Sequence, residues 1–289
     1  MKQQKLRAVY MRGGTSRCLV FRAEDLPAPG PARDAILLAA LGSPDPYGRQ
    51  LDGLGGGISS LSKACIIGPP TLPGADVDYT FAQVEVKKAF VDYAGNCGNC
   101  SSAVGPFAID EGLVRATEGV TRVRIHNTNT KKLIVAHVPV EDGEAAVGGD
   151  LELAGVAGRG ARIALDGLRY PADAADVVGR AISMGNCHRA FPLTVAMCLA
   201  VAARIDGTLV HECVVGSSRA ATAPPGRPER GGAGGHVGAP GSNDVRLAHP
   251  SGVLPLDAAV TLRHGVPWAE RVTVYRSARR LMEGFVRVP

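Results

Sequence analysis

The stretch NCGNCSSAVGPFA, residues 96–108, restricts what this chain can fold into more than any other segment. Its first half combines Gly98 with two asparagines, residue types that adopt unusual backbone angles in turns. Its second half is small and apolar, which is typical of a buried helix. The sequence therefore predicts a turn that opens directly into a buried helix ending near Gly112.

The start of such a helix favours negative charge. Its first N–H groups have no partner within the helix, and the helix dipole adds a partial positive charge. A carboxylate or a thiolate is therefore stabilised there. Cys97 stands at this point, which makes it the first candidate for chemistry, and the turn at Gly98 and Asn99 can hold a carboxylate.

The spacing of Cys97 and Cys100 allows several interpretations. A zinc site needs two further ligands, which Cys187 and His188 could supply. A thioredoxin-like dithiol suits a strand, turn and helix, but the rest of the chain does not resemble that fold. We favour a catalytic thiol at Cys97 with Cys100 buried in the helix. Two packed cysteines without chemistry remain the alternative.

A second glycine-rich loop, residues 53–63, ends in Lys63 beside a short apolar segment at 64–67. It is not a phosphate-binding loop, because Ser62 rather than glycine precedes the lysine and no Ser or Thr follows it. The glycine spacing of a dinucleotide-binding turn is also missing. Desolvation there could lower the pKa of a lysine so that it acts as a base. From the residues alone, a surface lysine after a turn is the simpler interpretation.

Apolar patterning predicts the remaining elements. Strands are expected at 6–10, 18–21, 64–67, 78–86, 120–126, 133–140, 177–183 and 285–288, and helices at 33–41 and 192–205. A small-residue helix that follows a strand and a turn occurs twice, which indicates a weak internal duplication. Residues 216–243 are rich in Gly, Pro, Ala and Arg, and they predict a mobile loop.

Composition excludes several classes of protein. The 289 residues are 45% apolar with a formal charge of +5, and no basic run is interleaved with aromatic residues. This suits a pocket for a small anion rather than a nucleic-acid surface. Seven scattered cysteines, an odd number, indicate reduced thiols in a cytoplasm. The N-terminus has no signal-peptide pattern, and the longest apolar run, 191–203, is too short to span a membrane.

Two histidines lie in turns. His188 follows Cys187, and His249 begins the sequence His-Pro-Ser-Gly at 249–252. A lone histidine beside a turn is more often a hydrogen-bonding residue than a catalyst. We therefore expect both to contact substrate or to support structure.

Five segments together resemble the PrpF family. They are MRGGTSR at 11–17, the loop GGG at 55–57 with Ser62-Lys63, GNCGN at 95–99, HPSG at 249–252 and SARRLMEG at 277–284. The match spreads from residue 6 to residue 289, and the combination is specific. The family includes 2-methylaconitate cis–trans isomerase, 4-oxalomesaconate tautomerase and methylitaconate isomerase. It shares the diaminopimelate-epimerase fold, two pseudo-symmetric lobes with a cleft between them.

The resemblance implies an α+β fold in which each lobe is a β-sheet wrapped around a central helix. We expect an N-terminal lobe at 1–130 with a return strand at 272–289, and a C-terminal lobe at 131–271. The second lobe is expected to be shortened, because about ten residues join the segments 162–166 and 177–183.

The resemblance also implies the site. Lys63 and Cys97 match the catalytic pair of the family. The implied substrate-binding residues are Arg12, Thr15, Ser16, Gly57, Ser59, Ser60, Asn96, Gly98, Asn99, Met184, Gly185, His188, His249, Ser251 and Arg279. No metal and no cofactor are implied, because moving a double bond beside a carboxylate needs only proton transfer and a stabilised carbanion or dienolate. The implied partner is a small polycarboxylate substrate, and a homodimer is a compatible assembly.

The expected function is therefore a cofactor-independent isomerase or tautomerase of a small unsaturated di- or tricarboxylate. The alternative is a catalytically weak carboxylate-binding or accessory protein. Retention of Lys63 and Cys97 favours the enzyme, whereas the short second lobe favours the alternative. Two further departures are Val195, where the family pattern has glycine, and Leu61, where it has threonine. An epimerase with two thiols is disfavoured because the turn at 249–252 has no cysteine.

Overall fold

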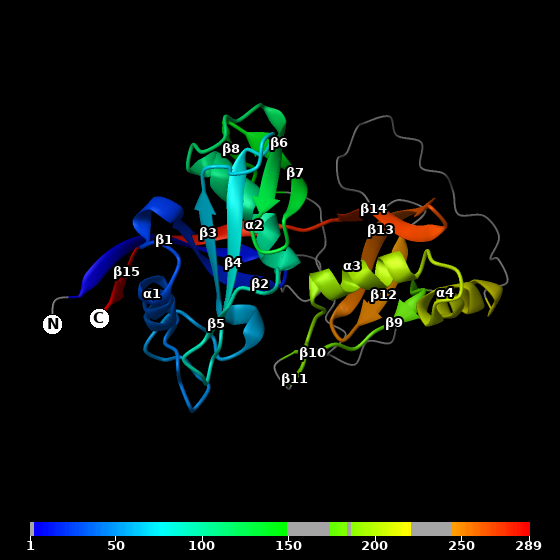
Figure 1. Cartoon of the computed structure of the whole chain (residues 1–289), viewed down its shortest axis with the longest axis horizontal. Helices are drawn as coiled ribbons and strands as arrows, with labels where there is room; N and C mark the ends of the chain where they lie inside the picture. Colours follow the sequence, from blue (N-terminus) through cyan, green and yellow to red (C-terminus); the bar gives the residue numbers. More distant parts are fainter. Residues whose placement is uncertain (1–2, 149–173, 184–185, 221–243) are drawn as a thin grey trace. The chain divides into compact units, whose positions relative to one another are not determined.

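A computed structural model describes residues 3–148, 174–183, 186–220 and 244–289 (Figure 1). The chain divides into two compact units: unit 1 is residues 1–150 with 276–289, and unit 2 is residues 151–275. The strand at 132–141, expected in the second lobe, lies in unit 1 because it pairs with the strand before it. The return to unit 1 begins at residue 276 rather than 272.

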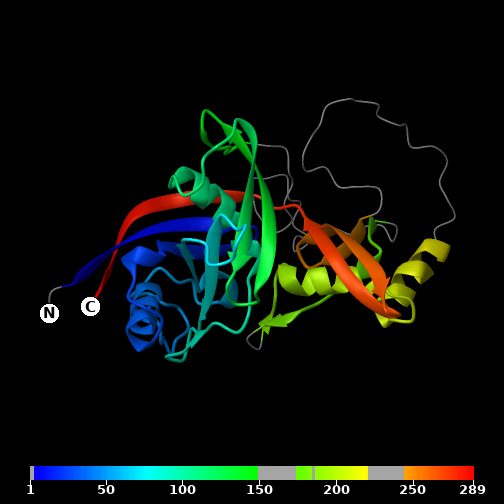
Figure 2. The same ribbon diagram turned by 45° about the horizontal axis from the view of Figure 1, so that its top comes forward.

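Unit 1 is built on one nine-stranded mixed sheet in the order β15-β1-β2-β3-β4-β6-β7-β8, with β5 paired to β4. Its strands are β1 (Gln4–Gly13), β2 (Ser16–Arg22), β3 (Lys63–Gly68), β4 (Val77–Val84), β5 (Val91–Asp92), β6 (Gly119–Asn127), β7 (Lys132–Glu141), β8 (Glu144–Ala145) and β15 (Ala278–Val288). The last strand pairs antiparallel with the first, from Gln4 opposite Val288 to Gly13 opposite Ala278, so the two run side by side in Figure 2.

The sheet of unit 1 separates two apolar cores. Side chains alternate between the two faces of a strand. In β2, Cys18 and Val20 face helix α2 (Gly98–Asp110), whereas Leu19 and Phe21 face the core of helix α1 (Pro31–Leu41). Helix α1 ends at Leu41, as predicted, and the residue after it, Gly42, adopts the left-handed conformation with φ 75°.

Helix α2 is the central helix of unit 1. It contacts β1, β2, β3, β4, β6, β7, β8 and β15, and most of its residues are buried. Small residues allow this close packing: a Cβ at Gly105 would lie 2.7 Å from Val138 Cγ2. The prediction of a buried helix after the turn at 96–99 is confirmed, with its last residue at Asp110, two residues before the predicted end near Gly112.

Unit 2 has a smaller four-stranded sheet in the order β14-β13-β12-β9, and a separate hairpin of β10 with β11. Its elements are β9 (Val177–Val178), β10 (Ile182–Ser183), β11 (Asn186–Cys187), α3 (Leu193–Ala202), α4 (Leu209–Ala220), β12 (Val245–His249), β13 (Gly252–Arg263) and β14 (Val266–Val274). The predicted strand at 177–183 is thus two short strands.

Helix α3, where the sequence predicted a helix at 192–205, is buried on one face only. The helix forms, and Leu193, Ala196 and Ala200 are buried in the core of unit 2. Val195 and Cys198 are exposed, however, because the described sheet of this unit covers one face of the helix. The sheet of unit 1, in contrast, surrounds α2.

The predicted mobile loop at 216–243 begins too early, because α4 continues to Ala220. A glycine inside a helix costs only about 1 kcal/mol relative to alanine, so Gly216 does not end this one. Residues 221–243 lie outside the described residues. Short 3-10 turns occur at Ala23–Asp25 and at Ser59–Leu61. No helix in the described parts of the chain is long and apolar enough to cross a bilayer. The predicted α+β class is confirmed.

Candidate active site

Cys97 is the N-cap residue of α2, the position at which the sequence placed it. Its backbone is extended, with φ −110° and ψ 101°, and its sulfur accepts the backbone N–H of Cys100 at 3.4 Å. The hydroxyl oxygen of Ser16 lies 3.8 Å from the same sulfur. Only 9% of the residue is exposed. The thiol therefore sits in a nearly closed site in which donors surround the sulfur.

This environment holds the pKa of Cys97 well below its ordinary value. The largest cause is a hydrogen bond from the Cys100 side chain, which outweighs the opposing effect of burial. The Lys63 charge, the Cys100 N–H and Ser16 also lower this pKa. The pKa of Cys100 moves in the opposite direction, mainly because burial disfavours its thiolate. Cys97 is thus the thiolate of the pair and Cys100 the thiol that donates to it.

Lys63 opens β3, and its side chain lies on the same face of the strand as Cys65, toward α2. Its ammonium donates to Gln83 Oε1 at 2.6 Å and lies 5.0 Å from the ring centre of Phe81. The residue is only 8% exposed. The Gln83 side chain donates in turn to the carbonyl of Ser62 at 2.8 Å, which fixes it in place.

Two glycines bring the turn between β1 and β2 against the start of α2. A Cβ at Gly13 would lie 2.3 Å from the Asn99 carbonyl oxygen, and one at Gly14 would lie 2.2 Å from Asn99 Oδ1. The amide of Asn99 bridges the two segments: its Nδ2 donates to Thr15 Oγ1 at 3.2 Å. Arg276 Nε donates to Asn99 Oδ1 at 3.1 Å, and burial lowers the pKa of this guanidinium to about 10.

The first turn of α2 has donors to offer. Within the described residues, the backbone N–H groups of Gly98 and Asn99 make no hydrogen bond, as expected for the first two positions of a helix. Asn96 Oδ1 accepts from Ser101 Oγ at 3.5 Å and Asn127 Nδ2 at 3.4 Å. These N–H groups lie beside the Cys97 sulfur, where a developing negative charge would be stabilised.

The glycine loop is anchored by the side chain of Gln50. The Gly57 N–H donates to Gln50 Oε1 at 2.9 Å, and Gln50 Nε2 donates to Ser62 Oγ at 2.7 Å. Gly57 has φ 73°, a conformation that favours glycine. Ser59 and Ser60 are half-buried in the 3-10 turn that precedes Lys63.

The other expected binding residues of unit 1 differ in their surroundings. Arg12 Nη1 donates to the carbonyls of Gly14 at 3.0 Å and Ser277 at 2.9 Å, so it holds the hairpin to the returning chain. Arg279 is exposed on β15, opposite Arg12 in the strand register.

The expected binding residues of the second lobe lie in unit 2. His249 is buried, and its Nδ1 accepts the N–H of Ser251 at 3.2 Å. Ser251 Oγ donates to the carbonyl of Arg189 at 2.5 Å. The N–H of His188 donates to the Ala181 carbonyl at 2.8 Å. Met184 and Gly185 lie outside the described residues. The binding role of every expected site residue remains a prediction.

Sequence reasoning missed several residues at this site. Gln83 orients Lys63, Gln50 anchors the glycine loop, and Arg276 contacts the start of α2. Arg276 directly precedes the segment 277–284 and was the easiest of these to find. Among the described residues, the one group of three metal-ligating side chains is Cys18, Cys65 and Cys100, which was not predicted either.

Comparison with known proteins places these features in context. Residues 3–176 match the family model described as PrpF protein. The chain is 33% identical to a 2-methyl-aconitate isomerase of Cupriavidus necator, with 99% of this chain and 98% of the relative covered. It is 50% identical to a 3-methylitaconate isomerase of Eubacterium barkeri over 64% of this chain and 47% of the relative. A crystal structure of methylitaconate-delta-isomerase superposes with a TM-score of 0.67 at 38% identity, covering 100% of this chain and 97% of that one.

The alignment with the Cupriavidus protein also exposes a difference in length. It extends over 410 positions, whereas the chain has 289 residues, so at least 121 positions (410 minus 289) have no counterpart here. The family match ends at residue 176, after the segments that carry Lys63 and Cys97.

Proposed function

The chain belongs to the PrpF family, and on this premise we propose that it is an isomerase that shifts a carbon–carbon double bond in a small unsaturated di- or tricarboxylate. Relatives named as isomerases of 2-methylaconitate and 3-methylitaconate support the reaction class. The observation that carries the proposal is the position of Cys97 as the N-cap of α2, where a hydrogen bond from Cys100 and the nearby charge of Lys63 lower its pKa. A thiolate beside a buried ammonium forms a base and an acid in one site.

We assign the base to Cys97, whereas the sequence alone also left Lys63 open as a base. The pKa of Cys97 is lowered mainly by a hydrogen bond from Cys100 and also by the charge of Lys63, which favours the thiolate as the base. The thiolate takes a proton from a carbon conjugated with a carboxylate. The electron pair moves into a dienolate, and the ammonium of Lys63 delivers a proton to the far carbon of the allylic system. The thiol and the amine then return to the resting state by exchanging protons with solvent.

The N–H groups of Gly98 and Asn99 would stabilise the charge that develops on a substrate carboxylate. Preorganised donors of this kind contribute about 3–4 kcal/mol each in well-studied enzymes. Gln83 supports the reaction by holding the ammonium of Lys63 in one position. Asn99 and Arg276 fix the position of the helix start relative to the β1–β2 turn. The net change is the migration of one proton and one double bond, with no electron carrier required.

A second function is favoured by one specific observation. At least 121 aligned positions of the Cupriavidus relative have no counterpart in this chain. If the lost positions include groups that bind substrate, the remaining site would hold a carboxylate without turning it over. The chain would then act as a carboxylate-binding or accessory protein.

Proton NMR in deuterated water separates the two functions. The purified chain would be incubated with 2-methylaconitate, 3-methylitaconate and 4-oxalomesaconate in turn, with Cys97→Ala as the control. The isomerase proposal expects deuterium incorporation and a new isomer for at least one acid, both absent in the control. Shifts of substrate signals by the chain without exchange or isomer formation would reject the enzyme in favour of a binding protein.

A further inference from the structure

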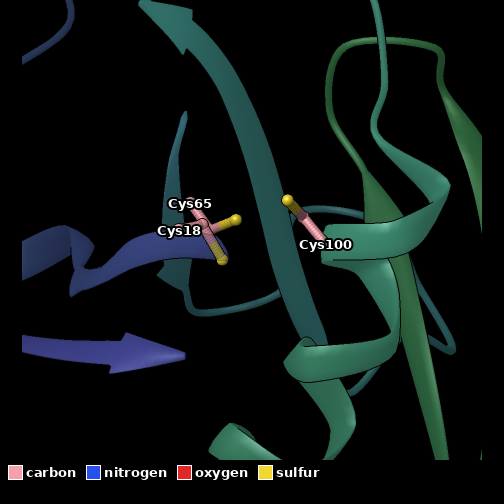
Figure 3. Close-up of side chains that lie close together, drawn as sticks. All are labelled: Cys18, Cys65 and Cys100. Atoms are coloured by element: carbon pink, nitrogen blue, oxygen red, sulfur yellow. The ribbon is translucent and has the colours of Figure 1, made fainter. Parts of the chain in front are cut away.

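Three buried thiols meet beside the candidate active site in an arrangement that the proposed reaction does not use. They belong to Cys18 of β2, Cys65 of β3 and Cys100 of α2, and we call them the three-thiol cluster. Their sulfur atoms all lie within 4.8 Å of one another, and their residues are 1%, 0% and 0% exposed. Figure 3 shows Cys18 and Cys65 on neighbouring strands, with Cys100 reaching toward them from the helix.

The fold explains why residues so far apart in sequence converge. Strands β2 and β3 are parallel neighbours, with Val20 opposite Cys65. Since alternate residues share a face, Cys18 points to the same side as Val20 and Cys65. That side faces α2, where Cys100 occupies the first turn. Cysteine packs in cores as a small apolar residue, but packing alone does not require three sulfur atoms to face one another.

The spacing of the sulfur atoms fits a single metal ion. At a metal–sulfur distance of about 2.3 Å, three ligands around one ion lie about 4 Å apart. Sulfur atoms within 4.8 Å of one another need to close by less than about 1 Å to reach that geometry. Each sulfur is held on a regular element of unit 1, so the backbone already supplies the arrangement.

The chemistry of the ligands selects the ion. The group contains thiols only, with no carboxylate or imidazole, which excludes the hard cations calcium and magnesium. Structural zinc takes four ligands in a tetrahedron, whereas three are gathered here. Thiolates prefer soft ions, of which monovalent copper is the biological example.

We propose that the three-thiol cluster is a binding site for a soft, monovalent metal ion of the cuprous type. Each sulfur that becomes a ligand releases its proton to solvent, and no oxidation takes place. Because a thiol must lose its proton to become a ligand, binding of the ion should strengthen as pH rises. The partial positive charge at the start of α2 offsets part of the negative charge that remains.

Occupation of the site would change Cys97. Cys100 donates its S–H to the Cys97 thiolate, and a metal-bound Cys100 has no proton to donate. The ion would therefore suppress any reaction that depends on Cys97. This consequence rests on the proposed function, whereas binding of the ion does not.

A chelator competition tests the site. The reduced protein, kept free of oxygen, would be titrated with Cu(I) in the presence of bicinchoninate, whose coloured complex reports the copper that the protein does not take. One equivalent should be removed from the chelator by the unmodified chain and by Cys198→Ala, which changes an exposed thiol outside the cluster. Cys18→Ala and Cys65→Ala should each lose at least tenfold in affinity. Failure of the unmodified chain to remove copper, or equal removal by Cys18→Ala, would overturn the proposal.

X-ray absorption of the copper-loaded wild-type chain gives a test that needs no folded variant. Three sulfur atoms at one distance are expected around the ion. Two sulfur atoms, or nitrogen and oxygen ligands, would place the copper elsewhere and refute the site. Because neither measurement uses catalysis, a negative result here is distinguishable from a failure of the isomerase proposal.

Discussion

Replacing Cys100 with alanine should raise the pKa of Cys97 by about one to two units. The substitution removes the side-chain donor that is the largest cause of the low pKa of Cys97, but it keeps the backbone N–H at 3.4 Å. A hydrogen bond to a charged group contributes about 1.5–3 kcal/mol. One pKa unit corresponds to about 1.4 kcal/mol, which gives the expected shift. Cys100→Ser should recover part of it, because a hydroxyl can still donate.

The rate of Cys97 alkylation by iodoacetamide, followed by mass spectrometry across a pH series, measures this pKa. Only the thiolate reacts, so the midpoint of the rate profile reports ionisation of Cys97. Cys198→Ala serves as the control, because it removes an exposed thiol from unit 2. An unchanged midpoint in Cys100→Ala would show that the Cys100 thiol does not stabilise the Cys97 thiolate.

Three further predictions concern the same region. Lys63→Met should also raise the Cys97 midpoint in the alkylation assay, because the favourable charge is lost; an unchanged or lower midpoint would show that Lys63 does not stabilise the Cys97 thiolate. Gly13→Ala should lower the free energy of unfolding, measured in urea, by about 1–3 kcal/mol, since its Cβ would overlap the Asn99 carbonyl, whereas Gly95→Ala, in open space, should change little. Above about pH 8.5 the free energy of unfolding should fall with pH, because the thiols of the three-thiol cluster stay protonated in the folded protein but ionise in the unfolded chain. Each such thiol should contribute about 1.4 kcal/mol per pH unit, so removing one of them should make the plot of unfolding free energy against pH less steep.

The sign of the alkaline effect follows from the direction of the shifts. The pKa values of the three cluster thiols are raised in the folded state. Their contribution to stability is therefore complete below the pKa that these thiols have in the unfolded chain, and it is lost as pH rises toward their pKa in the folded protein. Cys97 behaves in the opposite way, because its folded pKa is lowered. The contribution of Cys97 to stability is complete above the pKa that it has in the unfolded chain, and it is lost as pH falls through its pKa in the folded protein.

Local signals made much of unit 1 predictable. Gly42 ends α1, and the small residues after Cys97 indicate a buried helix, so both helices were placed within two residues of their observed bounds. The hairpin of β1 and β2 follows from two apolar runs around a glycine turn. Such features depend on neighbours in sequence, which is why a sequence reveals them.

Contacts between distant segments were not predictable in the same way. The pairing of β15 with β1 and the convergence of Cys18 with Cys65 arise from the order of strands in the sheet. Gln83 carries no motif, and its role depends on lying opposite Lys63 in the register of β3 and β4. Helix α4 was missed because Gly216 and the residues after it resemble a loop in composition.

The most direct test of the account asks which residue removes the substrate proton. Solvent deuterium exchange into an accepted acid would be followed by NMR for Lys63→Met and for Cys97→Ala. We predict that Lys63→Met still exchanges one carbon-bound proton but forms little isomer, because the thiolate base remains and the acid is lost. Cys97→Ala should do neither. Exchange that persists in Cys97→Ala and disappears in Lys63→Met would contradict the assignment of Cys97 as the base.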